Sequence, residues 1–200
     1  MQNPKIKFTY NSEVFNFTIK GCHVFPQGYP ALINKFSEMT GTSMIADIGC
    51  GTLNIICANG SKVDEQKCYT EKLGVEQFKI AAKNAVLAKF GKILDGNILE
   101  SFIKDGKVDI PGCYIEVLEA QAEKYSEAVM NALRSYEYEP DFMKLYVVGG
   151  GQYLLSRYGK LDTGKVTFIT DICAAAKGFE IGANVHLIME EKSRKKAVTS

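Results

Sequence analysis

The stretch MIADIGCGTLNII, residues 44–56, decides how the rest of the chain is interpreted. Apolar residues run up to Asp47, the sequence Gly-Cys-Gly-Thr follows, and apolar residues then resume. The two apolar runs predict buried strands over 43–48 and 53–58, joined by a glycine-rich tip. Such a tip serves either as a tight hairpin turn with a structural aspartate or as a cradle that binds phosphate.

The tip comprises Gly49, Cys50, Gly51 and Thr52. Its two glycines lack a Cβ, so a phosphate could closely approach several backbone N–H groups that point toward one place. Asp47 would repel a bare phosphate. It would fit a Mg²⁺ ion bound through water, because Mg²⁺ prefers oxygen ligands and retains several waters. Taken alone, the tip fits the cradle and the plain turn about equally well.

Two further stretches favour the cradle. Gly149, Gly150 and Gly151 follow the apolar run KLYVV, and three glycines there would let a flat ligand lie against bare backbone beside a helix N-terminus. Gln27 stands at the break in VFPQGYPAL. Its carboxamide could orient an attacking water by accepting and donating a hydrogen bond, although a plain turn residue also fits this position.

Strands alternate with helices along the rest of the chain, which indicates an α/β architecture. The other predicted strands cover 5–10, 13–19, 61–65, 144–148 and 165–170, and a short apolar strand end precedes the break at Pro26. The predicted helices cover the run through Ala31, Leu32 and Phe36, the stretch from Leu73 to Gly91, residues 115–136, the run through Tyr153 and Leu155, and the segment AAAKGFEIGANVHLIME. Residues 91–113 are rich in glycine and aspartate and have no assignment.

The composition excludes several classes of protein. The chain has 200 residues, of which 46% are hydrophobic and 24% charged, so it can bury a sizeable core. A net charge of +1 argues against broad electrostatic binding of nucleic acid. The six cysteines form no CxxC pair and only two histidines accompany them, which argues against a zinc site. A polar start and short apolar runs predict a cytoplasmic protein with reduced thiols and no membrane partner.

Together these stretches carry a family resemblance. VFPQGYPAL, MIADIGCGTLNI and LYVVGGGQYLL occur in the order and at about the spacing of the actin-like ATPases, and the chain most resembles the bacterial plasmid-segregation actins of the ParM/StbA type. EKLGVEQFKIAAKNAVLAKF and AAAKGFEIGANVHLI resemble two helices of that group. The resemblance implies an actin-like (ribonuclease H-like) α/β fold, a mixed sheet flanked by helices, with ATP or GTP and Mg²⁺ bound between two domains.

The resemblance also implies roles for individual residues. Asp47 would act at the metal ion and its waters, and Gln27 would position the hydrolytic water. The nucleotide would be bound by the backbone of Gly49, Cys50, Gly51 and Thr52 at its β- and γ-phosphates, by Gly149, Gly150 and Gly151 at its nucleoside, and by Gly74 near the ribose. Asn54 stands where ParM-type sequences usually have aspartate. Its amide can bind a water but cannot take a proton, which affects hydrolysis more than binding.

A first phosphate loop, which members of the family carry before the counterpart of VFPQG, has no match in this sequence. The expected division is a remnant of the first domain over 1–42, the second domain over 43–170 with a small helical subdomain near 73–136, and a closing helix and tail over 171–200. We therefore expect weak nucleotide binding and little or no hydrolysis by this chain alone.

Three functions remain open at this point. The first is a polymer-forming actin-like NTPase for plasmid segregation, whose partners would be its own filament neighbours and a DNA-bound adaptor protein, with no direct contact to nucleic acid. The second is a non-catalytic filament-assembly module, which Asn54 and the missing first loop favour. The third is another enzyme of the superfamily, such as a sugar kinase or a chaperone ATPase. The sequence shows neither a sugar-binding loop nor a long substrate domain.

Overall fold

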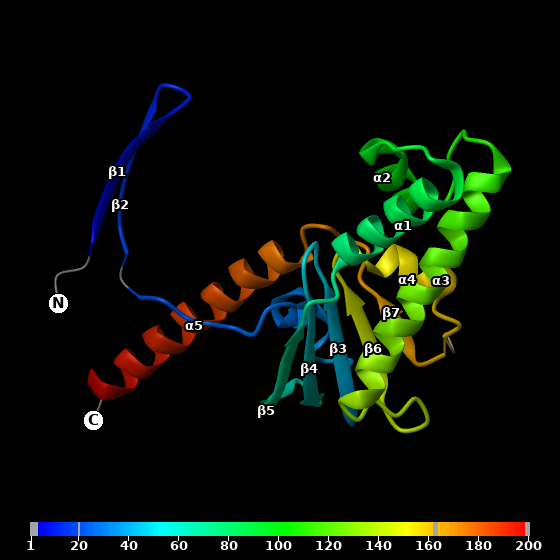
Figure 1. Ribbon diagram of the computed structural model, residues 1–200. Coiled ribbons are helices and arrows are strands. Elements are labelled where there is room, and N and C mark those ends of the chain that lie inside the picture. The colour runs from blue at the N-terminus through cyan, green and yellow to red at the C-terminus, as the bar shows by residue number, and fades with distance from the viewer. Residues whose placement is uncertain (1–3, 20, 162–163, 199–200) are drawn as a thin grey trace.

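A mixed five-stranded sheet forms the centre of the computed structural model, which describes residues 4–19, 21–161 and 164–198 (Figure 1). The strands are β3 (Thr42–Ile48), β4 (Leu53–Asn59), β5 (Lys62–Glu71), β6 (Lys144–Val148) and β7 (Val166–Phe168), in the order β5-β4-β3-β6-β7. β3, β4 and β5 pair antiparallel, whereas β6 runs parallel to β3 and β7 runs parallel to β6. The predicted α/β fold with a mixed sheet is confirmed.

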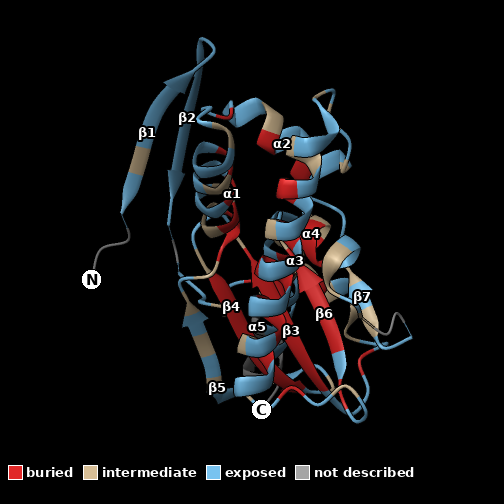
Figure 2. Cartoon of the chain, turned by 45° about the vertical axis from the view of Figure 1, so that its right-hand side comes forward, coloured by how far each residue is buried: buried red, intermediate tan, exposed pale blue. Residues whose placement is uncertain are grey.

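Helices cover both faces of the sheet because its central strands are apolar on both sides. Side chains alternate along β3, so Met44 and Ala46 join the larger core while Ile45 joins a smaller core on the opposite face. The larger core lies under α1 (Val75–Phe90), α2 (Gly96–Asp105), α3 (Gly112–Ser135) and α4 (Gln152–Tyr158). The smaller core includes Leu32 of the 3₁₀ helix η1 (Tyr29–Lys35), against which α5 (Ala174–Val198) packs. Figure 2 shows the buried strands between these layers.

The ends of the helices over the larger core have identifiable caps. Gly91 adopts a left-handed φ of 63° and ends α1, as the sequence predicted. The Asp95 carboxylate accepts a backbone N–H and begins α2, which lies within the stretch 91–113 that had no assignment. The Arg157 guanidinium of α4 donates to carbonyl groups at the C-terminal end of α2.

Four predictions of local structure need correction. The strand expected over 61–65 continues to Glu71, because β5 passes a register irregularity between its pairings with Ala58 and Ile56 and then pairs again with β4. The strand expected over 165–170 is only Val166–Phe168. Residues 21–26 do not form the strand end expected directly before the break, and the run through Ala31 is a 3₁₀ helix that ends before Phe36.

The N-terminal hairpin extends away from the sheet (Figure 1). Its strands are β1 (Lys5–Tyr10) and β2 (Glu13–Thr18), which correspond to the strands predicted over 5–10 and 13–19 and pair antiparallel. Aromatic side chains stay exposed on it, including Phe8 and Phe15, whose rings stack with centroids 5.1 Å apart. A hairpin of two strands is marginally stable by itself, so this one presents an uncovered apolar face. Within the described residues, no helix combines the length and apolar character needed to cross a bilayer.

A close contact at Gly178 joins α5 to η1. A Cβ built on Gly178 would lie 1.8 Å from the carbonyl oxygen of Pro30, a distance that no side chain tolerates. One turn later, a Cβ on Gly182 would lie 3.2 Å from the ring of Phe25. The glycines of α5 therefore serve packing, because they let the helix approach the segment that carries Gln27.

The substitution Gly178→Ala tests this contact. Alanine has a higher helix propensity than glycine by about 1 kcal/mol, but the clash with Pro30 should outweigh this gain and lower the free energy of unfolding by about 1–3 kcal/mol. Urea denaturation would measure the difference. Gly96→Ala is the matched control, because Gly96 also lies in a helix and no atom lies within 4 Å of the position that a Cβ on it would take. Equal stability of Gly178→Ala and the original chain would contradict the packing role.

Candidate functional site

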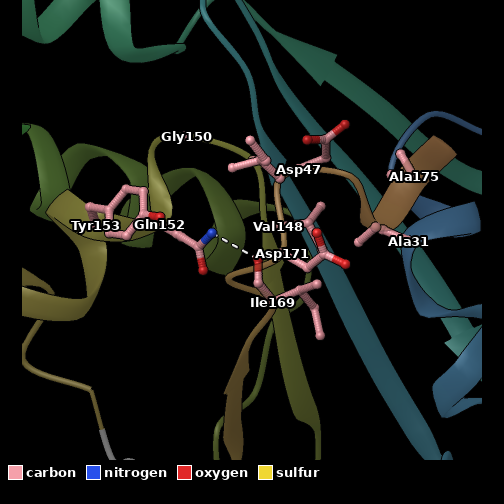
Figure 3. Close-up of a pocket in the computed structure, with 13 residues that line it drawn as sticks. Ala31, Asp47, Val148, Gly150, Gln152, Tyr153, Ile169, Asp171 and Ala175 are labelled. Carbon is pink, nitrogen blue, oxygen red and sulfur yellow. Dashed lines mark hydrogen bonds between the residues drawn. The ribbon is translucent and has the colours of Figure 1, made fainter. Parts of the chain in front are cut away.

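A pocket of about 180 Å³ lies where β3, β6 and β7 end (Figure 3). Because these strands are parallel, their carboxyl ends meet at one edge of the sheet, where α/β proteins commonly bind ligands. The pocket is lined by Gly28, Ala31, Asp47, Val148, Gly149, Gly150, Gln152, Tyr153, Ile169, Asp171, Ile172, Ala174 and Ala175. It therefore combines loop, strand and helix residues from both ends of the described chain.

Asp47 carries the charge at the centre of this edge. Asp47 is only 8% exposed, and its burial raises the pKa of the carboxyl group. Two side-chain amides, those of Asn54 and Gln27, lower the pKa by hydrogen bonding, but the effect of burial is larger. The structure thus brings together Gln27, Asp47 and Asn54, the three residues predicted to act in catalysis.

Asn54 lies directly opposite Asp47 in the β3–β4 ladder and is itself buried. Its Oδ1 accepts a hydrogen bond of 2.8 Å from the Thr70 hydroxyl, which fixes the orientation of the amide. Among the described residues, its Nδ2 has no well-aligned acceptor, so its contact with Asp47 is a loose one. The Nδ2 of Asn54 is therefore a buried donor at the Asp47 carboxylate with no better-aligned acceptor.

Two glycines let backbone close around Asp47. Gly28 has a φ of +88°, and a Cβ there would lie 2.6 Å from the Cβ of Asp47. Gly149 has a φ of +83°, and a Cβ there would lie 2.9 Å from the Asp47 Oδ1. Both positions need a left-handed backbone conformation and leave no space for a side chain. The carboxylate is consequently positioned by the break before η1 on one side and by the end of β6 on the other.

The glycine-rich tip between β3 and β4 is anchored by the start of α1. The N–H of Val75 donates to the carbonyl of Gly49 at 3.0 Å, and the N–H of Glu76 donates to that of Cys50 at 2.8 Å. Gly74 packs under the tip, since a Cβ there would lie 2.4 Å from the Cys50 oxygen. Hydrogen bonds from the first turn of α1 therefore hold the tip in place.

Several N–H groups of the tip have no acceptor among the described residues. The Gly49 N–H donates to the Thr52 carbonyl at 2.9 Å and closes the turn. Throughout the described chain, no protein group accepts the N–H groups of Cys50, Gly51 and Thr52. Cys50 and Gly51 are also exposed, so the N–H groups of these two residues are accessible to an anion.

The remaining predicted residues separate into two groups. Gly149 and Gly150 line the pocket. Gly151 packs against Ile48 instead, because a Cβ there would lie 2.1 Å from the Ile48 Cγ2, and Gly74 lies under the tip outside the pocket lining. Their proposed contacts with a nucleotide stay predictions.

The pocket residues that the sequence did not single out include Gly28, Gln152 and Asp171. Gln152 is 4% exposed, and its Nε2 donates to the carbonyl of Ile169 at 2.7 Å, which joins α4 to the end of β7. Asp171 accepts from Lys177, and this hydrogen bond lowers the pKa of Asp171. Gly28 and Gln152 directly follow predicted site residues, so proximity in sequence was an available signal. Asp171 follows β7, and only the order of the strands in the sheet places the end of β7 at this edge.

The sheet order, the tip after β3 and the triple glycine after β6 define an actin-like fold, and solved structures confirm that class. The chain is similar to Ta0583, an archaeal actin homolog in complex with ADP, with a TM-score of 0.70 and 20% identity over 91% of this chain and 64% of that chain. It is also similar to a subunit of a 15-stranded ParM filament from Clostridium botulinum, with a TM-score of 0.62 and 20% identity over 85% of this chain and 56% of that chain.

A third similar structure is Bacillus thuringiensis ParM with AMPPNP, with a TM-score of 0.55 and 15% identity over 73% of this chain and 48% of that chain. The chain thus spans less than two thirds of the length of these neighbours. No protein-family model and no curated protein matches the sequence. The similarity to the solved structures establishes the fold.

Replacing the buried charge tests the electrostatics of the site. Because the pKa of Asp47 is raised on folding, ionisation of this carboxyl opposes folding as the pH rises through its folded pKa. Asp47→Asn should therefore raise the free energy of unfolding at pH 7 by about 0.5–2 kcal/mol. The difference should shrink toward zero below about pH 3.9, where the carboxyl is protonated in both states.

Denaturation at a series of pH values would measure this effect, with the exposed Asp109→Asn as the control. A variant that is less stable than the original chain at pH 7 would show that hydrogen bonds from Asn54 and Gln27 outweigh the burial of the charge.

Proposed function

We propose that this chain is the nucleotide-binding half of an actin-like NTPase of the ParM/StbA type, whose intact form assembles into filaments that segregate plasmids. The observation that carries the proposal is the buried Asp47 carboxylate between the glycine-rich tip and the triple glycine. The solved neighbours support it, because they include an actin homolog in complex with ADP and a ParM filament. In this proposal residues 43–170 form the second actin-like domain, flanked by parts of the first over 1–42 and 171–200.

The partners in this proposal are other copies of the chain and a DNA-bound adaptor protein. The nucleotide is ATP or GTP with Mg²⁺, and the tip suits its phosphates, because the N–H groups of Cys50, Gly51 and Thr52 are unused by the described protein and two of these residues are exposed. Asp47 suits Mg²⁺, which commonly takes one or two carboxylates and keeps several waters. The metal ion would neutralise charge between the carboxylate and the phosphates.

The nucleoside end of the site is open. Gly149 and Gly150 line the pocket, and no atom lies within 4 Å of the position that a Cβ on Gly150 would take. The pocket volume of about 180 Å³ falls below the roughly 300–1,000 Å³ of sites that enclose a small molecule. This chain alone would thus surround only part of a nucleotide, which supports the expectation of weak binding.

Hydrolysis would depend on Gln27 and Asp47. The Gln27 carboxamide lies at the Asp47 carboxylate, where it could orient a water through one accepted and one donated hydrogen bond. Asn54, on the other side of Asp47, can bind the same water but cannot take its proton. Gln27 and Asn54 can position a water, and of the three residues only Asp47 can accept its proton, so we expect slow turnover.

A thermal-shift titration with Mg-ATP and Mg-GTP tests the site. A ligand that binds only the folded state stabilises it by about 2.7 kcal/mol at 100 times its Kd, so millimolar nucleotide should raise Tm even when binding is weak. Asp47→Ala should abolish the shift by removing the metal contact. Gly51→Ala is a milder variant. No atom lies within 4 Å of the position that its Cβ would take, so the added methyl group would meet only a bound phosphate.

Asp109→Asn, outside the pocket and the tip, is the control and should respond as the original chain does. An unchanged Tm at millimolar nucleotide would contradict binding by this chain and favour the non-catalytic assembly module. Phosphate release measured alongside should stay near background. Turnover at the rate of an intact enzyme would contradict the assignment of this chain as one half of a site.

A further inference from the structure

The N-terminal hairpin of β1 and β2 separates its apolar and polar side chains onto two faces. Side chains alternate along each strand, and residues paired across the ladder, such as Phe8 and Phe15, lie on the same face. The ladder continues past β2, because the Ile19 N–H donates to the Pro4 carbonyl at 3.0 Å. One face, here called the aromatic face, thus consists of Ile6, Phe8, Tyr10, Phe15, Phe17 and Ile19, with Glu13 at its turn end.

The rings of the aromatic face order one another. Phe8 stacks on Phe15 and meets Phe17 edge-on, with the second pair of ring centroids 6.1 Å apart. The aromatic side chains nevertheless stay between 38% exposed, at Phe15, and 65% exposed, at Tyr10. Figure 2 shows both strands exposed along almost their whole length. A preordered apolar face therefore lies in water, so a contact through it would cost little further ordering.

The charges of the hairpin limit what can cover this face. Residues 4–19 contain three charged side chains: Lys5 and Lys7, which lie on the polar face, and Glu13. None of the three forms an ion pair within the described part of the chain. The aromatic face thus carries no positive charge that would direct it to an anionic membrane or to nucleic acid. Its partner should be another apolar surface.

A second aromatic face meets this requirement. A single two-stranded hairpin is marginally stable until its apolar side is covered, and two hairpins packed face to face would each cover the other as the two layers of a small sandwich. If the hairpins run antiparallel about a two-fold axis, the two Glu13 carboxylates lie at opposite ends of the contact. Each then lies toward the end of the other hairpin that carries Lys5, so the charges favour this orientation.

The area of the contact predicts its strength. Complete burial of an aromatic side chain removes about 150–250 Å² from solvent, so the exposed parts of the six side chains amount to roughly 500 Å² per copy. Two facing copies would bury about 1,000 Å², which is near the lower limit for a specific interface. The dimer should therefore be weak, with a Kd in the micromolar to millimolar range.

We propose that the aromatic faces of two copies of this chain pack against each other about a two-fold axis, with the hairpins antiparallel. The same surface is used on both copies, so the assembly closes at a dimer. This contact goes beyond the proposed function, because it involves neither the nucleotide site nor a repeating filament contact. The hairpin extends away from the sheet, which leaves its aromatic face accessible to a second chain (Figure 1).

Sedimentation velocity without nucleotide, from micromolar to millimolar protein, tests the dimer. The original chain should convert from monomer to dimer and form nothing larger. Phe8→Thr and Phe17→Thr remove rings from the aromatic face and keep a residue that favours strands, so each should weaken dimerisation about tenfold or more. Val14→Thr is the matched control, because Val14 lies on the polar face of the same hairpin and is 64% exposed. It should dimerise as the original chain does.

Nuclear magnetic resonance locates the contact. In a mixture of ¹³C-labelled and unlabelled chains, isotope-filtered spectra should show contacts between aromatic rings of different copies. Phe8→Thr should reduce these contacts, whereas Val14→Thr should retain them. Unchanged circular dichroism spectra would show that the variants fold, because the hairpin lies apart from both cores.

A chain that stays monomeric at millimolar concentration would overturn the proposal, as would dimers that Phe8→Thr and Phe17→Thr leave intact. Assemblies larger than a dimer in the absence of nucleotide would overturn the closed two-fold contact. A monomer that binds vesicles of phosphatidylcholine and phosphatidylserine through Phe8 would replace the second copy with a membrane surface. None of these results decides the proposed function, which depends on the thermal shift with Mg-nucleotide and its loss in Asp47→Ala.

Discussion

The burial of one carboxylate organises the functional edge of this protein. Asp47 is the residue before the end of the central strand β3 and is only 8% exposed, and burying an ionised group is costly unless polar groups face it. Asn54 comes from the neighbouring strand, and Gln27 comes from the break before η1. The site therefore depends on strand pairing and on the packing of η1 over the sheet at the same time.

Close backbone approaches make this convergence geometrically possible. Gly28 and Gly149 bring two loops against Asp47, Gly74 lets α1 anchor the tip, and Gly178 lets α5 contact η1. In each case the nearest atoms belong to a segment distant in sequence or on another element. The glycines at these positions are therefore requirements of tertiary packing, and a methyl group at any of them would displace an element that carries part of the site.

Local patterns predicted the strands around the tip, the strands β1 and β2, and the helices α1 and α3, because alternation and helical periodicity are properties of neighbouring residues. They failed where the structure of a segment depends on residues distant in the sequence. The continuation of β5 depends on renewed pairing with β4. The place of Asp171 in the pocket depends on which strands are adjacent in the sheet, and the clash at Gly178 depends on Pro30, so no local pattern carried either feature.

Helix α1 connects the glycine-rich tip to the larger core. Its first N–H groups donate to the carbonyls of Gly49 and Cys50, and Val86 near its other end is buried in that core. A nucleotide at the tip can change assembly only by as much as it binds the assembled chain more tightly than the free one. Because α1 is hydrogen-bonded to the tip, a shift of the tip would be transmitted to α1 and to α3, which packs against it. In the proposed function, α1 is therefore the element that would couple nucleotide binding to assembly.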